Sequence, residues 1–234
     1  MIWNGLELPE AYYQDDAVYI IHGDCRDILP LIPDKSIDLV LTDPPYGIGL
    51  NHKNLASKRA FRSYDPNCRS IDWGNVIGDA TPFDPTFLLH YHNIILWGAN
   101  HYASRLPDSH FWFAWDRKCG VAADNDSTDM ELAWVKGLNY KTVRVFRHMW
   151  CGFQRDSEVG EKHLHPTQKP VELFQWCLNW FPKAGYILDP FMGAGASIVA
   201  AKKLNRKCIG IEIEEKYCSI AAKRCSQSVM RLEC

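Results

Sequence analysis

Residues 186–195 read YILDPFMGAG, the pattern of a buried strand that runs into a glycine turn, and a helix is predicted directly after them over 196–204. Glycine lacks a side chain and tolerates positive φ, so such a turn lets the backbone approach a bound nucleotide closely. A tight structural turn explains these residues almost as well. A second strand, over 207–211, is followed by Glu212, at about the distance expected for a carboxylate that binds both hydroxyls of a ribose. Together the two strands predict an adenosine site.

The rest of the chain repeats this alternation of strands and helices. Short β-branched and apolar runs alternate with helical segments, which is typical of an α/β sheet covered on both faces. Strands are predicted at 18–22, 37–41, 93–97, 110–115, 186–188 and 207–211, and helices at 85–91, 170–180, 196–204 and 214–226. Most of the strand runs are continuously apolar, as in buried strands.

The chain of 234 residues, 47% of them apolar, has the size of one domain, which we expect to span 1–234. Within it we distinguish a catalytic half, 18–119, and a cofactor-binding half, 163–226. Between them, 120–162 is read as a small insertion on the main sheet, with strands at 131–135 and 142–148. The polar stretch 47–81 is a long loop, and loops of that length inside a domain are usually functional or mobile.

Composition excludes several classes of protein. No run approaches the roughly 20 apolar residues of a membrane span, and the N-terminus lacks a basic region followed by an apolar one. The nine cysteines are scattered and never spaced as Cys-x-x-Cys, which favours reduced thiols over a disulfide scaffold. Neither of two histidine pairs has further ligands at metal spacing, so we expect structural or surface histidines and no metal. These features predict a cytoplasmic protein without a membrane partner.

A formal net charge of -2 gives no overall attraction to phosphate, so contacts to nucleic acid require local patches. Two stretches, 47–70 and 136–155, are rich in basic residues and contain aromatic neighbours, which favours a nucleic-acid surface. Solvated loops or strand faces are the alternative. The candidate DNA contacts are Lys53, Lys58, Arg59, Arg62, Lys141, Arg144 and Arg147.

The predicted adenosine site differs from a dinucleotide site. Ile198 stands where the third glycine of the dinucleotide fingerprint would be, and no turn suited to a pyrophosphate is evident. Adenosine without pyrophosphate suits S-adenosylmethionine. In HPTQKP, residues 165–170, the Thr167 hydroxyl and the Lys169 ammonium can hold the carboxylate of the cofactor's methionine part, although a capped helix entry is compatible with the same residues.

Asp43-Pro44-Pro45-Tyr46 follows the strand at 37–41, where ligands bind in open α/β sheets. An exocyclic base amine is a poor nucleophile because its lone pair is delocalised. If the Asp43 carboxylate and the Pro44 carbonyl accept its hydrogens, the lone pair turns toward the methyl group. Two prolines fix the backbone, and Tyr46 can stack on a base extruded from the duplex. An ordinary stiff turn with a buried tyrosine is the alternative.

The order of these motifs, from GDCRDILPLIPDKSIDLVLTDPPYGI through HPTQKP to LDPFMGAGAS and IGIEIEEKY, resembles the beta class of DNA amino-methyltransferases over most of 18–225. The resemblance implies a Rossmann-like, mostly parallel, seven-stranded sheet that binds S-adenosylmethionine, with a small target-recognition insertion. It implies catalytic roles for Asp43, Pro44, Pro45 and Tyr46. It implies cofactor contacts from Asp24, Thr167, Lys169, Asp189, Phe191, Gly193, Gly195 and Glu212.

Within that family, Asp at the head of the tetrapeptide is commoner for adenine N6 and Ser for cytosine N4, so Asp43 favours adenine. Methylation of cytosine N4 or of an RNA base stays open, as does a catalytically silent nucleic-acid-binding module. The segment for target recognition, about 120–162, is short compared with many relatives. DNA is therefore the expected partner, while a homodimer and a cognate restriction enzyme stay open.

Overall fold

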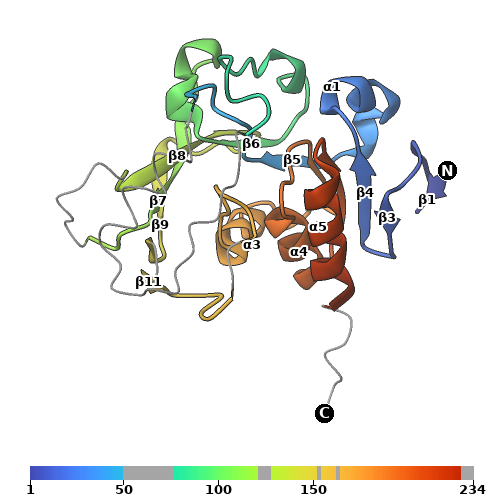
Figure 1. The fold of residues 1–234 in the computed structure, drawn as a ribbon. Helices are drawn as coiled ribbons and strands as arrows, with labels where there is room; N and C mark the ends of the chain where they lie inside the picture. The colour runs from blue at the N-terminus through green and yellow to red at the C-terminus, as the bar shows by residue number, and fades with distance from the viewer. Residues whose placement is uncertain (50–75, 121–127, 152–153, 162–163, 228–234) are drawn as a thin grey trace.

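The computed structural model describes residues 1–49, 76–120, 128–151, 154–161 and 164–227 (Figure 1). Its central feature is a sheet of nine strands in the order β3-β4-β13-β12-β5-β6-β8-β7-β9. The strands are β3 (Tyr13–Gln14), β4 (Val18–His22), β13 (Lys207–Glu212), β12 (Tyr186–Asp189), β5 (Leu39–Thr42), β6 (Ile94–Trp97), β8 (Met130–Lys136), β7 (Phe111–Asp116) and β9 (Thr142–Arg147).

Strand direction in this sheet confirms the predicted mostly parallel α/β fold. Among the central seven strands, from β4 to β7, only β8 is reversed; it pairs antiparallel with both β6 and β7. The short β3 and the strand β9 extend the two edges. All residues of β5 and β6 are buried, which explains their continuous apolar sequences.

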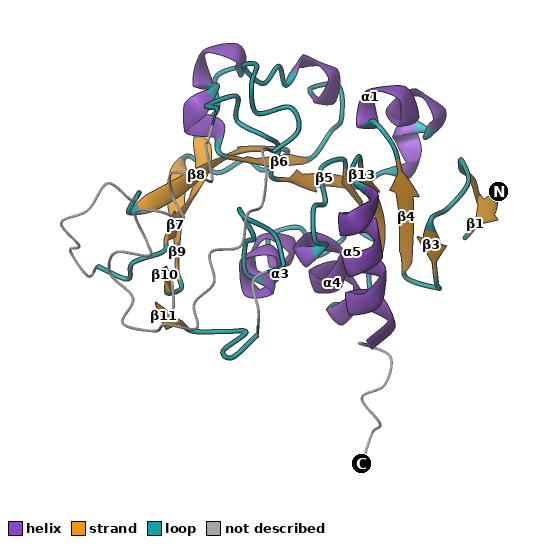
Figure 2. Ribbon diagram, viewed as in Figure 1, coloured by secondary structure: helices purple, strands orange, loops and turns teal. Residues whose placement is uncertain are grey.

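Two apolar clusters cover the two faces of the sheet. On one face, α3 (Val171–Asn179), α4 (Ala196–Lys203) and α5 (Glu215–Gln227) pack against inward-facing side chains such as Ile20 and Leu41. On the other, Tyr19 and Val40 belong to a cluster with α1 (Cys25–Ile28) and several 3-10 turns. Figures 1 and 2 show the three longer helices together on one side of the sheet.

Short elements complete the fold. The 3-10 turns are η1 (Leu29–Leu31), η2 (Asp34–Ser36), η3 (Thr86–Leu88), η4 (Ala99–His101) and η5 (Ala103–Arg105). Two small antiparallel hairpins pair β1 (Ile2–Trp3) with β2 (Leu6–Glu7) and β10 (Trp150–Cys151) with β11 (Gln154–Arg155). No described helix has the length and apolar character needed to cross a membrane.

One prediction from the sequence needs correction. The helix expected at 85–91 is only the 3-10 turn η3, because the chain must turn at once into β6, where the Asn93 side chain donates a hydrogen bond to the Asp38 carbonyl. The described part of 120–162 contains the two strands that the sequence predicted on the main sheet. It supplies β8 and β9 to the main sheet, and β8, with Ala133 and Trp134 buried, fills the space between β6 and β7.

The chain order places a crevice between β5 and β12. After β12 the chain passes through α4 to β13 on one side, whereas after β5 it continues to β6 on the other. Connections that leave adjacent parallel strands in opposite directions open a crevice at the carboxyl ends of those strands, where ligands bind in this class of fold.

Gly195, which precedes α4, has φ of +80°, and a Cβ atom there would lie 2.8 Å from the Ala221 Cβ of α5. We expect Gly195→Ala to lower the free energy of unfolding by about 2–4 kcal/mol, because it adds a steric clash to backbone strain. Gly5→Ala is the matched control: its φ is +85° with no atom within 4 Å, so strain alone costs about 1 kcal/mol. Urea denaturation measures both, and equal losses would contradict close packing of α4 on α5.

Candidate active site

A hydrogen-bonded carboxylate joins the ends of β5 and β12. Asp189, 2% exposed, accepts hydrogen bonds from the Thr42 hydroxyl (2.6 Å), the Phe191 amide (3.0 Å) and the Ser197 hydroxyl. Burial raises the pKa of Asp189 to about 6, although these hydrogen bonds favour the charged form. Both oxygens of Asp189, a predicted cofactor contact, are thus used to hold the glycine turn on β5.

Glu212 lies at the end of β13, beside the glycine turn. Its Oε2 accepts a hydrogen bond from the Gly193 amide (3.0 Å), and its Oε1 accepts one from the Glu214 amide (2.8 Å). The side chain is 8% exposed, and burial raises its pKa to about 6. Each oxygen retains a further lone pair, so this carboxylate can accept two more hydrogen bonds, as the hydroxyls of a ribose require.

The remaining predicted cofactor contacts lie on neighbouring turns. Asp24 caps α1 by accepting from the Arg26 amide at 2.9 Å, and the adjacent Gly23 amide donates to the Glu212 carbonyl. The partly exposed Phe191 ring packs edge-on against Phe83, with centroids 5.6 Å apart. The structure therefore places Asp24 and Phe191 beside the strand ends that carry Glu212 and Asp189.

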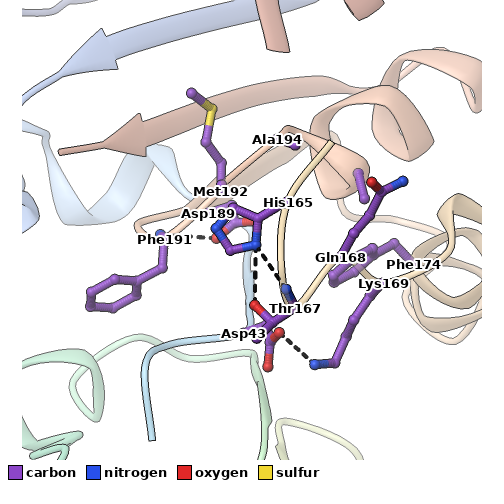
Figure 3. Close-up of a pocket in the computed structure, with 12 residues that line it drawn as sticks. Asp43, His165, Thr167, Gln168, Lys169, Phe174, Asp189, Phe191, Met192 and Ala194 are labelled. Carbon is purple, nitrogen blue, oxygen red and sulfur yellow. Dashed lines mark hydrogen bonds and ion pairs between the residues drawn. The ribbon is translucent and has the colours of Figure 1, made fainter. Parts of the chain in front are cut away.

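One pocket is lined by residues of both predicted halves, among them Asp43, Thr167, Phe191 and Gly193 (Figure 3). Figure 3 shows Lys169 directed at Asp43, and His165 joined to Thr167, whose hydroxyl lies 3.1 Å from His165 Nδ1. The pocket is partly open to solvent, with about 380 Å³ of empty space between and beyond its lining atoms.

Both oxygens of Asp43 are engaged. Oδ1 accepts from the Tyr46 hydroxyl (2.5 Å), and Oδ2 from the Lys169 ammonium (2.5 Å). Burial raises the pKa of Asp43, and the positive charge of Lys169 offsets only part of the increase. Lys169, predicted as a cofactor contact, is 5% exposed in its side chain, and its ammonium contacts the Asp43 carboxylate.

The Tyr46 ring is held between Gly98 and His101. It stacks on the His101 ring with centroids 4.8 Å apart and an interplanar angle of 15°. Gly98 has φ of +69°, and a Cβ there would lie 1.8 Å from Tyr46 Cε1, so glycine is required for the ring to fit. Pro44 is buried and Pro45 partly buried between Asp43 and this ring. The four predicted catalytic residues thus form one rigid turn.

Sequence reasoning missed two charged side chains behind Lys169. Glu131, at the start of β8, lies with Oε2 3.0 Å from the Lys169 ammonium, and its Oε1 accepts a hydrogen bond from Arg117 at 2.8 Å. A charged residue near the start of a mostly apolar strand was the available signal, but sequence spacing does not connect it to Lys169. In the residues that the structure describes, no group of three or more His, Cys, Asp or Glu side chains could hold a metal ion.

The predicted DNA contacts fall in two places. Lys53, Lys58, Arg59 and Arg62 lie outside the described residues, but the described ends of their loop meet directly after the tetrapeptide, where the Gly47 amide donates to Asp79 at 2.9 Å. Lys141, Arg144 and Arg147 lie on or next to edge strand β9 and are exposed. β9 is four strands from β5, roughly 19 Å at normal strand spacing.

Comparisons with solved structures agree with this architecture. PvuII DNA methyltransferase (cytosine-N4-specific) has a TM-score of 0.59 at 13% identity, covering 92% of this chain and 88% of that chain. The M1.HpyAVI complex with S-adenosylmethionine has a TM-score of 0.51 at 21% identity, covering 89% and 98%. At these identities the similarity shows a shared fold.

Sequence comparisons identify a relative and a matching family model. The type II methyltransferase M.ScaI of Streptomyces caespitosus is 26% identical over 262 aligned positions, which cover 93% of this chain and 84% of that protein. The family model of N6_N4_Mtase, described as DNA methylase, matches residues 79–223, more than half of the chain. The chain therefore belongs to the DNA methylase family.

Proposed function

We propose that this protein transfers a methyl group from S-adenosylmethionine to the N6 amine of an adenine in DNA. The observation that carries the proposal is the meeting of Asp43 and the glycine turn in one pocket. A carboxylate that accepts hydrogen bonds and a turn that suits a nucleoside are the two parts that methylation of a base amine requires.

The residues around the glycine turn fit S-adenosylmethionine. Glu212 offers two oxygens to ribose hydroxyls, each already oriented by a backbone amide. Gly193, with φ of +50°, has no side chain to block approach to the turn, and Phe191 offers an aromatic surface to adenine. When bound, the cofactor supplies an electrophilic methyl group. Thr167 and Asp24 remain proposed contacts from the flanking turns.

Asp43 orients the target amine. An ionised Asp43 accepts one of its hydrogens, the Pro44 carbonyl accepts the other, and the nitrogen lone pair is turned toward the methyl group. The Tyr46 ring, fixed by His101, forms a wall against which an extruded base can lie. Contact with Asp43 requires the amine to share or displace the ammonium of Lys169, which occupies Oδ2 in this structure.

Asp43 at the head of the tetrapeptide supports adenine, and methylation of cytosine N4 stays the alternative. We also propose that two sets of basic residues contact DNA phosphates. They are the exposed Lys141, Arg144 and Arg147 at the β9 edge, and Lys53, Lys58, Arg59 and Arg62. A homodimer would extend a short recognition surface, and a cognate restriction enzyme would suit a type II modification activity such as that of M.ScaI.

We expect Asp43→Ala to lower kcat by about 100-fold or more, because it removes the acceptor that aligns the amine. The dissociation constant for S-adenosylmethionine should change by no more than about twofold. Transfer of labelled methyl groups to DNA and calorimetry measure the two quantities. Asp108→Ala, which removes an exposed carboxylate, is the control and should retain wild-type activity. An active Asp43→Ala variant would remove the proposed role.

Cofactor affinity should depend on pH through Glu212. Its pKa of about 6 means that the carboxylate is ionised at pH 8 and protonated at pH 5. Since protonation removes acceptor capacity, the dissociation constant for S-adenosylmethionine should rise as pH falls below about 6. Calorimetry between pH 8 and pH 5 measures this, and Glu212→Gln should bind weakly at every pH. A variant that kept the full pH dependence would assign it to another group, such as Asp189.

A further inference from the structure

The Lys169 ammonium is surrounded by three oxygen atoms. It donates hydrogen bonds to Asp43 Oδ2 (2.5 Å) and to the Tyr46 hydroxyl (3.0 Å), and it forms an ion pair with Glu131 Oε2 at 3.0 Å. These contacts hold the ammonium beside the Asp43 carboxylate.

Four charges of alternating sign form a chain through the site. Asp43 contacts Lys169, Lys169 contacts Glu131, and Glu131 contacts Arg117. The exposed fractions of these side chains run from 5% for Lys169 to 23% for Arg117. A buried charge is tolerated when it is paired and hydrogen-bonded, and removing one member of such a chain leaves its neighbour uncompensated.

The reversed strand explains how Glu131 reaches this chain. Because β8 runs antiparallel to β6 and β7, its first residues lie at the sheet edge where the parallel strands end, and Glu131 pairs with Trp115 near the end of β7. Arg117 directly follows β7. The site thus receives a side chain from the amino end of a strand, next to residues from the carboxyl ends of the others.

We propose that Glu131 is a positioning residue of the methyl-transfer reaction, which holds the Lys169 ammonium at the catalytic side of the pocket and shares it with Asp43. The inference rests on the proposed function. Glu131 touches neither base nor cofactor and acts through Lys169. When a base amine approaches Asp43, Glu131 retains the ammonium, so that Oδ2 becomes available without a lysine left unpaired in a buried position.

The groups that face Asp43 set the expected effect of pH. They come from several elements: Lys169 before α3, Glu131 of β8, Tyr46, Tyr102 after η4, and Asp189 of β12. The negative charge of Glu131 raises the pKa of Asp43, whereas Lys169 lowers it. Asp43 must be ionised to accept the amine hydrogen, so removing the charge of Glu131 should move the acidic limb of the rate profile to lower pH.

The test compares Glu131→Gln, Lys169→Met and the double variant with wild type, and uses Glu7→Gln, an exposed site in β2, as the charge-matched control. Glu131→Gln should lower kcat at least about fivefold, because the ammonium then pairs with Asp43 alone and competes with the amine. Its acidic limb should shift to lower pH. In the Lys169→Met background, Glu131→Gln should change kcat by less than about twofold, because no ammonium is left to position.

Cofactor affinity supplies a readout that does not depend on activity. Calorimetry should give dissociation constants for S-adenosylmethionine within about twofold of wild type for Glu131→Gln and Lys169→Met, which also shows that both variants are folded. A tenfold rise for Lys169→Met would identify Lys169 as a cofactor ligand and overturn the inference.

Two other results would also overturn the role of Glu131 alone: an equal loss of kcat with and without Lys169, or a kcat and pH profile like those of Glu7→Gln. By contrast, a wild-type protein that methylates no DNA would contradict the proposed function itself.

Discussion

The adjacency of β5 and β12 is the constraint on which the rest of the site depends. The two strands are far apart in the chain, yet they pair in parallel, and a hydrogen bond from Thr42 to Asp189 joins their ends across 147 positions of sequence. Asp43 follows one strand and the glycine turn follows the other. Without this pairing, the carboxylate proposed to orient an amine and the turn proposed to bind a nucleoside would not share a pocket.

Buried carboxylates give this crevice its chemical character. The pKa values of Asp189 and Glu212 are raised to about 6, and that of Asp43 is also raised, in each case chiefly by burial. An acid whose pKa is higher in the folded state than in the unfolded state reduces stability at neutral pH, and this loss is relieved as pH falls through the folded value. Such a cost at one place in a fold is typical of functional sites.

Local sequence was enough to predict the parts of the site that depend on a strand and the turn after it. Asp43 and Glu212 lie where predicted because each follows a continuous apolar run that forms a buried strand. The sequence also indicated that α4 follows the glycine turn. The prediction of a helix at 85–91 was wrong. Apolar and aromatic content alone does not define a helix when the chain must enter the next strand within a few residues.

The contacts that sequence did not predict depend on long-range pairing. Glu131 reaches Lys169 only because β8 is reversed and inserted between β6 and β7, and no local pattern encodes the direction of a strand. Gly98 is another example of a long-range effect. Glycine is required at this position because a Cβ atom would clash with the Tyr46 ring, which follows a different strand.

Nucleoside mass spectrometry of DNA and structured RNA, each incubated with the wild-type protein and S-adenosylmethionine, tests the central claim most directly. The account predicts N6-methyladenine in the DNA and no methylated base in the RNA. N4-methylcytosine in the DNA would keep the amine chemistry and contradict the choice of adenine. Methylated RNA with unmodified DNA, or no methylated base in either, would contradict the account.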